Sequence, residues 1–329
     1  MSGERTTVAV VGAGAMGGRL AGRLLRSGVA VTVWNRTREK LRPLQELGAK
    51  TAETPGDATA RSEVVISMVA DPDALRAVTE GPRGIAAAAS PGQTLLEMST
   101  VGPAAVHRLA EGLPAGVELL DAPVLGSLSE AESGSLAIFV GGDPAVLERR
   151  RSLLELLGSP LHAGPLGCGA AAKLVANSTL LGVLGLLGEA LALSEGLGLA
   201  RDTSFSVLAA TPLAAQAERR RPAVEGGDVP VRFPLSLARK DADLIAAAAR
   251  EADVELAVGE ALRRSLAAAE DAGWGERDYS TLVAWLLDGA GGVKTPGSKG
   301  RRARRSARGG AGGRPDPSPA DAASPPAGR

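Results

Sequence analysis

The sequence predicts an α/β fold with a doubly wound parallel sheet, followed by an all-α second half. Strand-like apolar runs alternate with helical stretches in the first half of the chain, which is typical of a parallel sheet with crossover helices. After Gly164 the apolar positions have helical spacing and the strand-like runs end. The predicted strands are Thr7–Val11, Val29–Trp34, Val64–Val69, Thr94–Met98 and Val117–Leu120.

The helical stretches divide the chain into three parts. The predicted helices are Met16–Ser27 and Thr37–Leu47 in the first half, and Ala170–Leu199, Thr203–Leu208, Leu235–Glu251 and Val258–Ala272 in the second. We therefore expect a dinucleotide-type α/β domain at residues 1–166 and a helical domain at 167–288. Residues 289–329 are rich in Gly, Pro, Ser and Arg without periodicity, which predicts a disordered tail.

Composition limits the chemistry. The chain has 37 basic and 37 acidic residues, but the tail holds nine Lys or Arg against two Asp, a net of +7, so residues 1–288 carry −7. A single cysteine, Cys168, excludes an internal disulfide and a cysteine-cluster metal site. With only His107 and His162 besides, we expect no metal. Cys168 is predicted to be a small buried spacer, and neither histidine has a partner at a meaningful spacing.

The N-terminus and the longest apolar run bear on localisation. Residues 1–7 are polar and lack the apolar core of a signal peptide, so we expect a cytoplasmic protein. The apolar run Leu174–Leu193 contains Asn177, Glu189 and several glycines, which favours a buried central helix over a membrane span.

A glycine-rich turn follows the first predicted strand. Its sequence is Gly12-Ala13-Gly14-Ala15-Met16-Gly17, a G-x-G-x-x-G motif between a strand and a helix. In this context the first glycine permits a tight turn, the second lets a pyrophosphate approach the backbone, and the third allows close packing. The motif predicts a Rossmann domain that binds a dinucleotide at a helix N-terminus.

The end of the second strand indicates which dinucleotide is bound. An NAD enzyme usually has an acid there that accepts hydrogen bonds from the ribose hydroxyls. This chain has Asn35-Arg36-Thr37, and an arginine without a neighbouring acid suits a 2′-phosphate. We predict NADPH as the cofactor, the alternative being that Arg36 is only a solvated residue at a helix start.

The helical half begins with the sequence Gly167-Cys-Gly-Ala-Ala-Ala-Lys173-Leu-Val-Ala-Asn177. Lys173 and Asn177 are four residues apart and share one helix face. A lysine surrounded by Ala, Leu and Val is desolvated, which lowers its pKa and suits it to proton transfer. The alternative is an ordinary lysine at a helix start.

Together these motifs resemble the β-hydroxyacid dehydrogenase family, the 3-hydroxyisobutyrate dehydrogenase-like enzymes. The family's motifs occur here in order, at Gly12–Gly17, Asp121–Ser127, Gly167–Asn177 and Lys240–Leu244. The likeness spans roughly residues 5–288. The segments Val31–Thr37 and Phe233–Leu235 are most similar to the glyoxylate/succinic semialdehyde reductase branch.

The resemblance implies a role for each matching residue. Lys173 would protonate the carbonyl oxygen and Asn177 would orient the substrate. The cofactor would contact Met68 and Val69 through their backbone, Thr100 near the nicotinamide, and Lys240. Gly126 and Ser127 would hold a substrate carboxylate through backbone N–H groups, and Phe233 would line the pocket or serve only packing. The family's serine in the substrate loop is replaced by Leu125, which makes that point of the pocket more apolar.

The predicted function is NADPH-dependent interconversion of a small aldehyde or keto acid and its hydroxy acid, and we expect the protein to form a homodimer. An imine reductase on the same fold is the second candidate: Lys173 argues against it and Leu125 for it. A 6-phosphogluconate dehydrogenase is disfavoured because Ala176 stands where that enzyme usually has His. A non-catalytic interaction protein is disfavoured by the presence of Lys173. The basic run Lys299–Arg308 has no aromatics to stack on bases, so we expect a solvated tail rather than a nucleic-acid contact.

Overall fold

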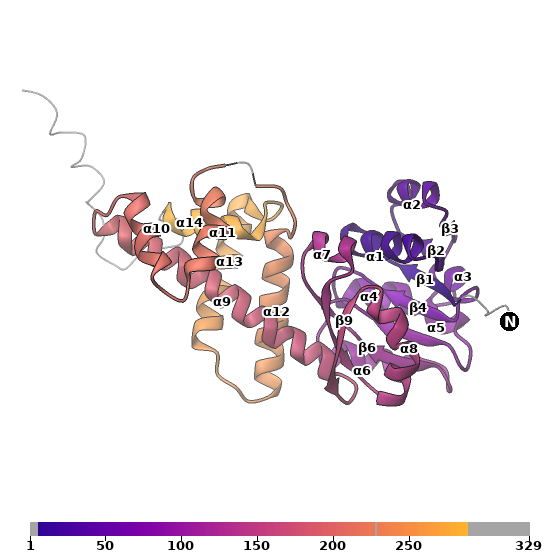
Figure 1. The fold of residues 1–329 in the computed structure, drawn as a ribbon. Coiled ribbons are helices and arrows are strands. Elements are labelled where there is room, and N and C mark those ends of the chain that lie inside the picture. The colour runs from indigo at the N-terminus through magenta and orange to yellow at the C-terminus, as the bar shows by residue number, and fades with distance from the viewer. Residues whose placement is uncertain (1–5, 228, 289–329) are drawn as a thin grey trace, which may run out of the picture. The chain divides into compact units, whose positions relative to one another are not determined.

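The computed structural model describes residues 6–227 and 229–288, so the predicted disordered tail at 289–329 lies outside the described residues. One nine-stranded sheet runs through the first half, in the order β3-β2-β1-β4-β5-β6-β8-β7, with β9 paired to β8 (Figure 1). Its strands are β1 (Thr7–Val11), β2 (Ala30–Trp34), β3 (Lys50–Thr51), β4 (Val64–Ser67), β5 (Thr94–Glu97), β6 (Glu118–Asp121), β7 (Val124–Leu125), β8 (Leu136–Gly141) and β9 (Gly158–Gly164).

The parallel part of the sheet has a point where the strand order reverses. β1 lies between β2 and β4, so the chain winds outward in both directions from β1. Ligands of open α/β sheets bind beyond the carboxyl ends of the strands at such a point. The glycine-rich turn, which follows β1 directly, lies there. The predicted doubly wound parallel sheet is confirmed.

The far edge of the sheet differs from the prediction. β8 runs antiparallel to both β6 and β7, while β9 is parallel to β8, so the sheet is mixed. β8 and β9 were not predicted at all. β9 contains Pro160, and only one of its residues (Gly158) is buried. Both features suit an edge strand, and its sequence therefore lacks the apolar run of a buried strand.

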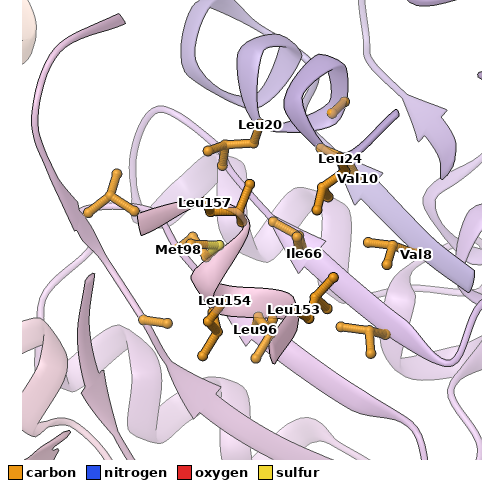
Figure 2. Packing of buried hydrophobic residues seen from close by; sticks show 14 of the residues in the cluster. Val8, Val10, Leu20, Leu24, Ile66, Leu96, Met98, Leu153, Leu154 and Leu157 are labelled. Carbon is orange, nitrogen blue, oxygen red and sulfur yellow. The ribbon is translucent and has the colours of Figure 1, made fainter. Parts of the chain in front are cut away.

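Two apolar layers cover the two faces of the sheet. Val8 and Val10 of β1 point to one face, where they pack with Leu20 and Leu24 (Figure 2). Leu153, Leu154 and Leu157 close the same layer further along the sheet (Figure 2). Ala9 and Val11 point to the other face, with Val65 and Leu95. Strands buried on both faces read as continuous apolar runs, which is why the sequence identified them.

Helices surround the sheet and make up the second half. Those of the first half are α1 (Ala15–Arg26), α2 (Arg42–Glu46), α3 (Pro55–Thr59), α4 (Pro72–Thr79), α5 (Ile85–Ala88), α6 (Pro103–Gly112), α7 (Leu128–Ser133) and α8 (Pro144–Glu155), with the 3₁₀ turn η1 (Arg38–Leu41). Those of the second half are α9 (Cys168–Gly196), α10 (Arg201–Ala209), α11 (Ala214–Val224), α12 (Leu235–Glu251), α13 (Ala257–Ala269) and α14 (Leu282–Leu287), with the π turn η2 (Glu270–Trp274) and the 3₁₀ turn η3 (Tyr279–Thr281).

Several predicted helix bounds differ from the structure. The predicted helix Thr37–Leu47 is instead the turn η1 followed by the short α2, whose start is set by Pro43. The predicted helix Val258–Ala272 ends at Ala269 and continues as a π turn because Gly273 has a positive φ. α11 and α14 were not predicted. The helix predicted at Leu235–Glu251 has those bounds.

The long helix α9 is central to the second half. It is long and apolar enough to cross a membrane by length and composition alone. Its buried leucines, among them Leu181, Leu184 and Leu187, form one cluster with residues of α12, α13 and α14. A core helix of this kind passes the same hydropathy test as a membrane span.

Candidate active site

The glycine-rich turn has the geometry that a dinucleotide requires. Gly12 has a φ of +98°, and a Cβ there would lie 2.2 Å from the Met68 carbonyl oxygen, so only glycine fits. A Cβ at Gly17 would lie 2.2 Å from the Gly12 oxygen, which keeps the first turn of α1 close to the loop. Nothing lies within 4 Å of a Cβ at Gly14, so this side of the turn is open to a phosphate. The residues present therefore fit a dinucleotide.

Arg36 lies at the expected place, just after β2. The Asn35 side-chain amide donates to the Thr37 carbonyl oxygen at 2.9 Å, which shapes the loop around the arginine. The nearby carboxylate of Glu53 pairs with Arg38 instead. Within residues 6–227 and 229–288, Arg36 is exposed and forms no ion pair with an acid.

Lys173 lies in the second turn of α9 and is 8% exposed. Burial lowers the pKa of its ammonium group to about 8, an effect opposed by the negative charge of Asp241 and reinforced by Lys240. Across the described part of the chain, no carboxylate approaches Lys173 within ion-pair distance. The direction of this pKa shift agrees with the expectation from the sequence. Near pH 8 such a group can both release and regain a proton.

A polar network joins the lysine helix to α12 and to the loop after β5. The Asn177 side-chain nitrogen donates to Asp241 Oδ2 at 2.7 Å, and Lys240 Nζ lies 2.6 Å from Asp241 Oδ1. Lys240 Nζ also donates to the Thr100 carbonyl oxygen at 2.7 Å. Asp241 is 2% exposed, so this charge is held in a largely dry environment. The network brings together three residues of the predicted site (Asn177, Thr100 and Lys240), and its charges on Asp241 and Lys240 act on the pKa of Lys173.

The first turn of α9 is fixed to the sheet by Asp121 at the end of β6. One Asp121 oxygen accepts from the Gly167 N–H at 2.9 Å and the other from the Ala170 N–H at 2.7 Å. A Cβ at Gly169 would lie 2.4 Å from the carbonyl oxygens of Asp121 and Phe139, so the helix contacts the strands directly. The two glycines before the lysine thus set how far α9 approaches the sheet. These contacts lie less than two helical turns before Lys173, and they fix its position relative to the sheet.

A second buried acid supports the loops that follow β4 and β5. Glu97 is fully buried, accepts from the Ser99 N–H at 2.8 Å and is hydrogen-bonded to the Ser67 hydroxyl. Burial raises the pKa of Glu97 to about 7. The Ser99 hydroxyl accepts from the Val69 N–H at 2.9 Å. This acid therefore holds the backbone of the predicted nicotinamide-side loops.

The predicted substrate loop follows β7 and carries a capping box. β7, which contacts α9, leads into Gly126 and Ser127, and Ser127 precedes α7. The Ser127 N–H, predicted to bind a substrate carboxylate, donates to Glu130 Oε2 at 2.8 Å. The Ser127 hydroxyl also donates to Glu130, and Ser129 donates to it at 3.0 Å. These bonds lower the pKa of Glu130 to about 2, so a permanent negative charge lies on this loop.

Phe233 lies in the segment before α12. Its ring meets that of Tyr279 edge to face, with 5.3 Å between centroids. Asp278 Oδ2 accepts from the N–H groups of Arg232 and Phe233, at 3.0 and 3.2 Å, and so fixes the segment. The packing role considered for Phe233 is present, and its pocket role stays a prediction.

Sequence reasoning assigned no role to several residues of the site. Asp121 and Asp241 lay inside the quoted motifs Asp121–Ser127 and Lys240–Leu244 but received no role. Glu130 carried a readable signal, because Ser127 and Glu130 form the S-x-x-E pattern of a capping box. His107 packs against Gly167, where a Cβ would lie 2.8 Å from Nε2. Cys168 is half-buried, not buried, because it lies at the open end of the first turn of α9.

Comparison with known proteins identifies the family. Residues 7–169 match the NAD-binding domain of 6-phosphogluconate dehydrogenase, and residues 167–286 match the NAD-binding domain of NADP-dependent 3-hydroxyisobutyrate dehydrogenase. Glyoxylate/succinic semialdehyde reductase 1 of Arabidopsis thaliana is 30% identical, over 84% of this chain and 96% of the relative. The chain belongs to the β-hydroxyacid dehydrogenase family.

Solved structures agree with this assignment. The 3-hydroxyisobutyrate dehydrogenase of Mycobacterium tuberculosis, solved with L-serine, is 26% identical with a TM-score of 0.77, over 86% of this chain and 99% of that one. An imine reductase of Myxococcus stipitatus, solved with NADP⁺, is 25% identical with a TM-score of 0.57, over 85% and 99%. As a member of this family, the chain is an NAD(P)-dependent oxidoreductase that acts on a small substrate.

Proposed function

We propose that this β-hydroxyacid dehydrogenase homologue reduces a small aldehyde or keto acid to its alcohol with NADPH, using Lys173 as the general acid. The observation that carries the proposal is the environment of Lys173. Its ammonium group is buried, its pKa is lowered to about 8, and it lies beside the Asn177–Asp241–Lys240 network that reaches Thr100. A buried proton donor next to the predicted nicotinamide side is what carbonyl reduction requires.

The turn Gly12–Gly17 and Arg36 would hold the dinucleotide, and its reduced nicotinamide, when bound, would supply a hydride to the carbonyl carbon. The chain's own task is to neutralise the negative charge that develops on the carbonyl oxygen. Lys173 Nζ donates a proton to that oxygen, becomes a neutral amine, and regains a proton from solvent before the next cycle. Asp241 keeps the ammonium form populated near neutral pH, because its negative charge opposes the effect of burial. Asn177, held by Asp241, presents its amide to the substrate hydroxyl or carbonyl oxygen.

The preference for NADPH follows from the loop after β2. Arg36 is exposed, Arg38 takes the only carboxylate that this loop contacts within the described residues, and the position after β2 is the neutral Asn35. An unpaired guanidinium without a competing acid forms charge-assisted hydrogen bonds to a 2′-phosphate.

The proposal is tested by following NADPH oxidation with short aldehydes, aldehyde acids, keto acids and cyclic imines. Lys173→Met keeps the length of the side chain and removes the proton, so kcat on the best carbonyl substrate should fall by about 10²-fold or more. Lys50→Met, an exposed lysine on β3, is the matched control and should leave kcat unchanged. Near-normal turnover of the Lys173→Met enzyme would contradict the proposed role of Lys173.

A second candidate is reduction of imines. It is favoured by Leu125, which makes the loop after β7 apolar, and by the similarity to the Myxococcus stipitatus imine reductase. An iminium substrate accepts hydride without needing a proton from the enzyme. If the Lys173→Met variant still reduces imines and the protein turns over no carbonyl compound, imine reduction becomes the favoured function.

We also propose that the protein is a homodimer that pairs through α9. Val175, Leu186, Leu193 and Leu197 are each more than half exposed, and their spacing places them on one face of the helix. The opposite face of α9 is already buried in the helical core. A second copy of the same helix, related by a twofold axis, offers an equally apolar surface of matching length.

A further inference from the structure

The loops after β4 and β5 lie on the opposite side of the strand-order reversal from Arg36. A dinucleotide crosses the sheet at this reversal, and its adenosine ribose lies beyond the end of the second strand. Arg36 follows β2, whereas Met68 and Val69 follow β4 and Thr100 lies in the loop after β5. The loops after β4 and β5 therefore belong to the nicotinamide half of the proposed dinucleotide site.

Glu97, the last residue of β5, connects these two loops. Its side chain is fully buried. Glu97 Oε1 accepts from the Ser99 N–H at 2.8 Å, and Oε2 accepts from the Ser67 hydroxyl at the end of β4. The Ser99 hydroxyl in turn accepts from the Val69 N–H at 2.9 Å. An ionisable group is thus built into the backbone support of the nicotinamide half.

The charge of Glu97 has no cationic partner in the part of the chain that the structure describes. None of the ion pairs within residues 6–227 and 229–288 involves Glu97. Its register partner on the neighbouring strand β6 is a second buried acid, Asp121. Burial, reinforced by the negative charge of Asp121, raises the pKa of Glu97 to about 7.

Three helices, α4, α6 and α9, pack on the face of the sheet to which Glu97 belongs. On α4, Asp73 and Arg76 form an ion pair with each other. On α6, the charge of His107 acts on Asp121, and on α9 burial lowers the pKa of Lys173 to about 8. The other charged residues of α6 are Arg108 and Glu111, which are exposed. Lys173 is therefore the group whose titration has to be separated from that of Glu97 in an experiment.

The two redox forms of the cofactor differ in the charge of the nicotinamide ring. The ring is positive in NADP⁺ and neutral in NADPH, whereas the 2′-phosphate and the pyrophosphate are common to both. A buried carboxylate without a cationic partner attracts a positive charge through a medium of low dielectric constant. A protonated carboxyl group exerts no such attraction.

We infer that Glu97 controls the preference of the site for oxidised over reduced nicotinamide: the ionised acid favours the oxidised form and the protonated acid does not. This inference rests on the proposed placement of the dinucleotide and goes beyond the proposed reaction. Because the pKa of Glu97 is about 7, the preference should change between pH 6 and pH 8.

The test measures cofactor binding in the absence of substrate. NADPH is titrated by its own fluorescence, and NADP⁺ by displacement of bound NADPH. Lys173 loses a positive charge near pH 8, which also favours NADP⁺, so the measurement is made in the Lys173→Met protein as well as in wild type. In Lys173→Met, the affinity for NADP⁺ relative to NADPH should rise about three- to tenfold from pH 6 to pH 8. A ratio that is constant over this range overturns the inference.

Two glutamine variants in the Lys173→Met background assign the effect to one acid. Glu97→Gln retains an acceptor for the Ser99 N–H and a polar partner for the Ser67 hydroxyl, and it mimics the protonated acid. Its affinity ratio should stay at the value that the parent protein has at pH 6. Glu118→Gln makes the same change at the first residue of β6, where the partner is Arg149, and should leave the pH-dependent rise intact. A rise that persists in Glu97→Gln, or that disappears equally in Glu118→Gln, overturns the inference.

A second measurement requires no substitution at Glu97. Calorimetric titration at pH 7, in two buffers with different ionisation enthalpies, gives the number of protons released on binding. Because NADP⁺ favours the ionised acid, its binding to Lys173→Met should release about 0.3 proton more than NADPH binding does. Equal proton release by the two cofactors overturns the inference.

These measurements distinguish the inference from the proposed function. If the affinity ratio depends on pH as expected but no carbonyl compound oxidises NADPH, the proposed reaction fails and the role of Glu97 stands. If carbonyl turnover is robust but the ratio is independent of pH, only the role of Glu97 fails. If the protein prefers NADH to NADPH, the same titrations are made with NAD⁺ and NADH, whose nicotinamide rings carry the same charges.

Discussion

The side-chain nitrogen of Asn177 lies 2.7 Å from Asp241 Oδ2, joining two helices whose residues are 64 positions apart in the chain. This bond matters because Asp241 is also the charge that raises the pKa of Lys173 against the effect of burial. The Asp241 carboxylate thus orients the Asn177 amide and also raises the pKa of Lys173. The following predictions start from this arrangement.

Asp241→Asn should move the pH dependence of carbonyl reduction. Removing the negative charge lowers the pKa of Lys173 below about 8, so the fall of kcat with rising pH should begin at a lower pH. Asp243→Asn, two residues along α12, removes a charge that faces Arg239 and Arg263 and should not move the profile. The test is to measure pH–rate profiles of wild type and the two variants. Coincident profiles for Asp241→Asn and wild type would contradict the predicted shift.

Lys173→Met should stabilise the folded protein while lowering its carbonyl reductase activity. The folded-state pKa is lowered from 10.5 to about 8, so below pH 8 the buried ammonium costs about 3 kcal/mol, a cost that disappears as pH rises from 8 to 10.5. The unfolding free energy of the variant should therefore exceed that of wild type by up to this amount at pH 7. Urea titrations should show that the difference in unfolding free energy between the variant and wild type is smaller at pH 10.5 than at pH 7. A variant less stable than wild type at pH 7 would contradict the prediction that burial of the ammonium group destabilises the fold.

Glu97→Gln should change how stability depends on pH. The folded-state pKa of Glu97 is raised from 4.5 to about 7, so its favourable contribution is complete below pH 4.5 and is lost as pH rises through 7. Relative to wild type, the glutamine variant should become progressively more stable between pH 5 and pH 8. Glu63→Gln, an exposed acid just before β4, serves as the control. The prediction fails if the stability difference between variant and wild type is constant over that range.

Arg36→Ala should weaken NADPH binding and leave NADH binding nearly unchanged. A charge-assisted contact to a phosphate contributes roughly 1–3 kcal/mol, so the preference for NADPH should drop by about ten- to a hundredfold. Arg38→Ala, whose guanidinium pairs with Glu53, should have a smaller effect on that preference. Fluorescence titration of both cofactors gives the affinities, and an unchanged preference in Arg36→Ala excludes Arg36 as the phosphate ligand.

Leu193→Glu combined with Leu186→Glu should convert the proposed dimer into a monomer. Both side chains are more than half exposed on the same face of α9, and a charged pair there would be buried between two copies. Leu161→Glu on β9 is an equally exposed apolar residue away from this face. Analytical ultracentrifugation at micromolar concentration separates the states. A wild-type monomer would rule out the assembly directly.

The sequence predicted well those features whose signal is local. The strand, glycine turn and helix from Thr7 to Arg26 form one continuous pattern, and α12 has the apolar spacing of a helix from its first residue to its last. The same holds for the lysine helix, whose pairing of Lys173 with Asn177 depends only on helical periodicity.

The remaining features depend on contacts between distant residues. β8 pairs antiparallel with β6 and parallel with β9, an arrangement that no short window of sequence encodes. Asp121 has its role because α9 returns 46 residues later to offer two N–H groups. Glu130 is a different case, because its capping pattern with Ser127 is visible in the sequence itself.

The anchoring of α9 has a consequence for how this protein can diverge. Lys173 is positioned by the hydrogen bonds from the Gly167 and Ala170 N–H groups to the Asp121 carboxylate and by the close approach of Gly169 to the strands. None of these residues belongs to the bend at Gly126 and Ser127. Replacements in the bend therefore leave the proton donor in place, and replacements at the anchor disturb every substrate alike. Homologues of this protein can therefore differ in substrate, through substitutions in the bend, and still catalyse the same type of reaction.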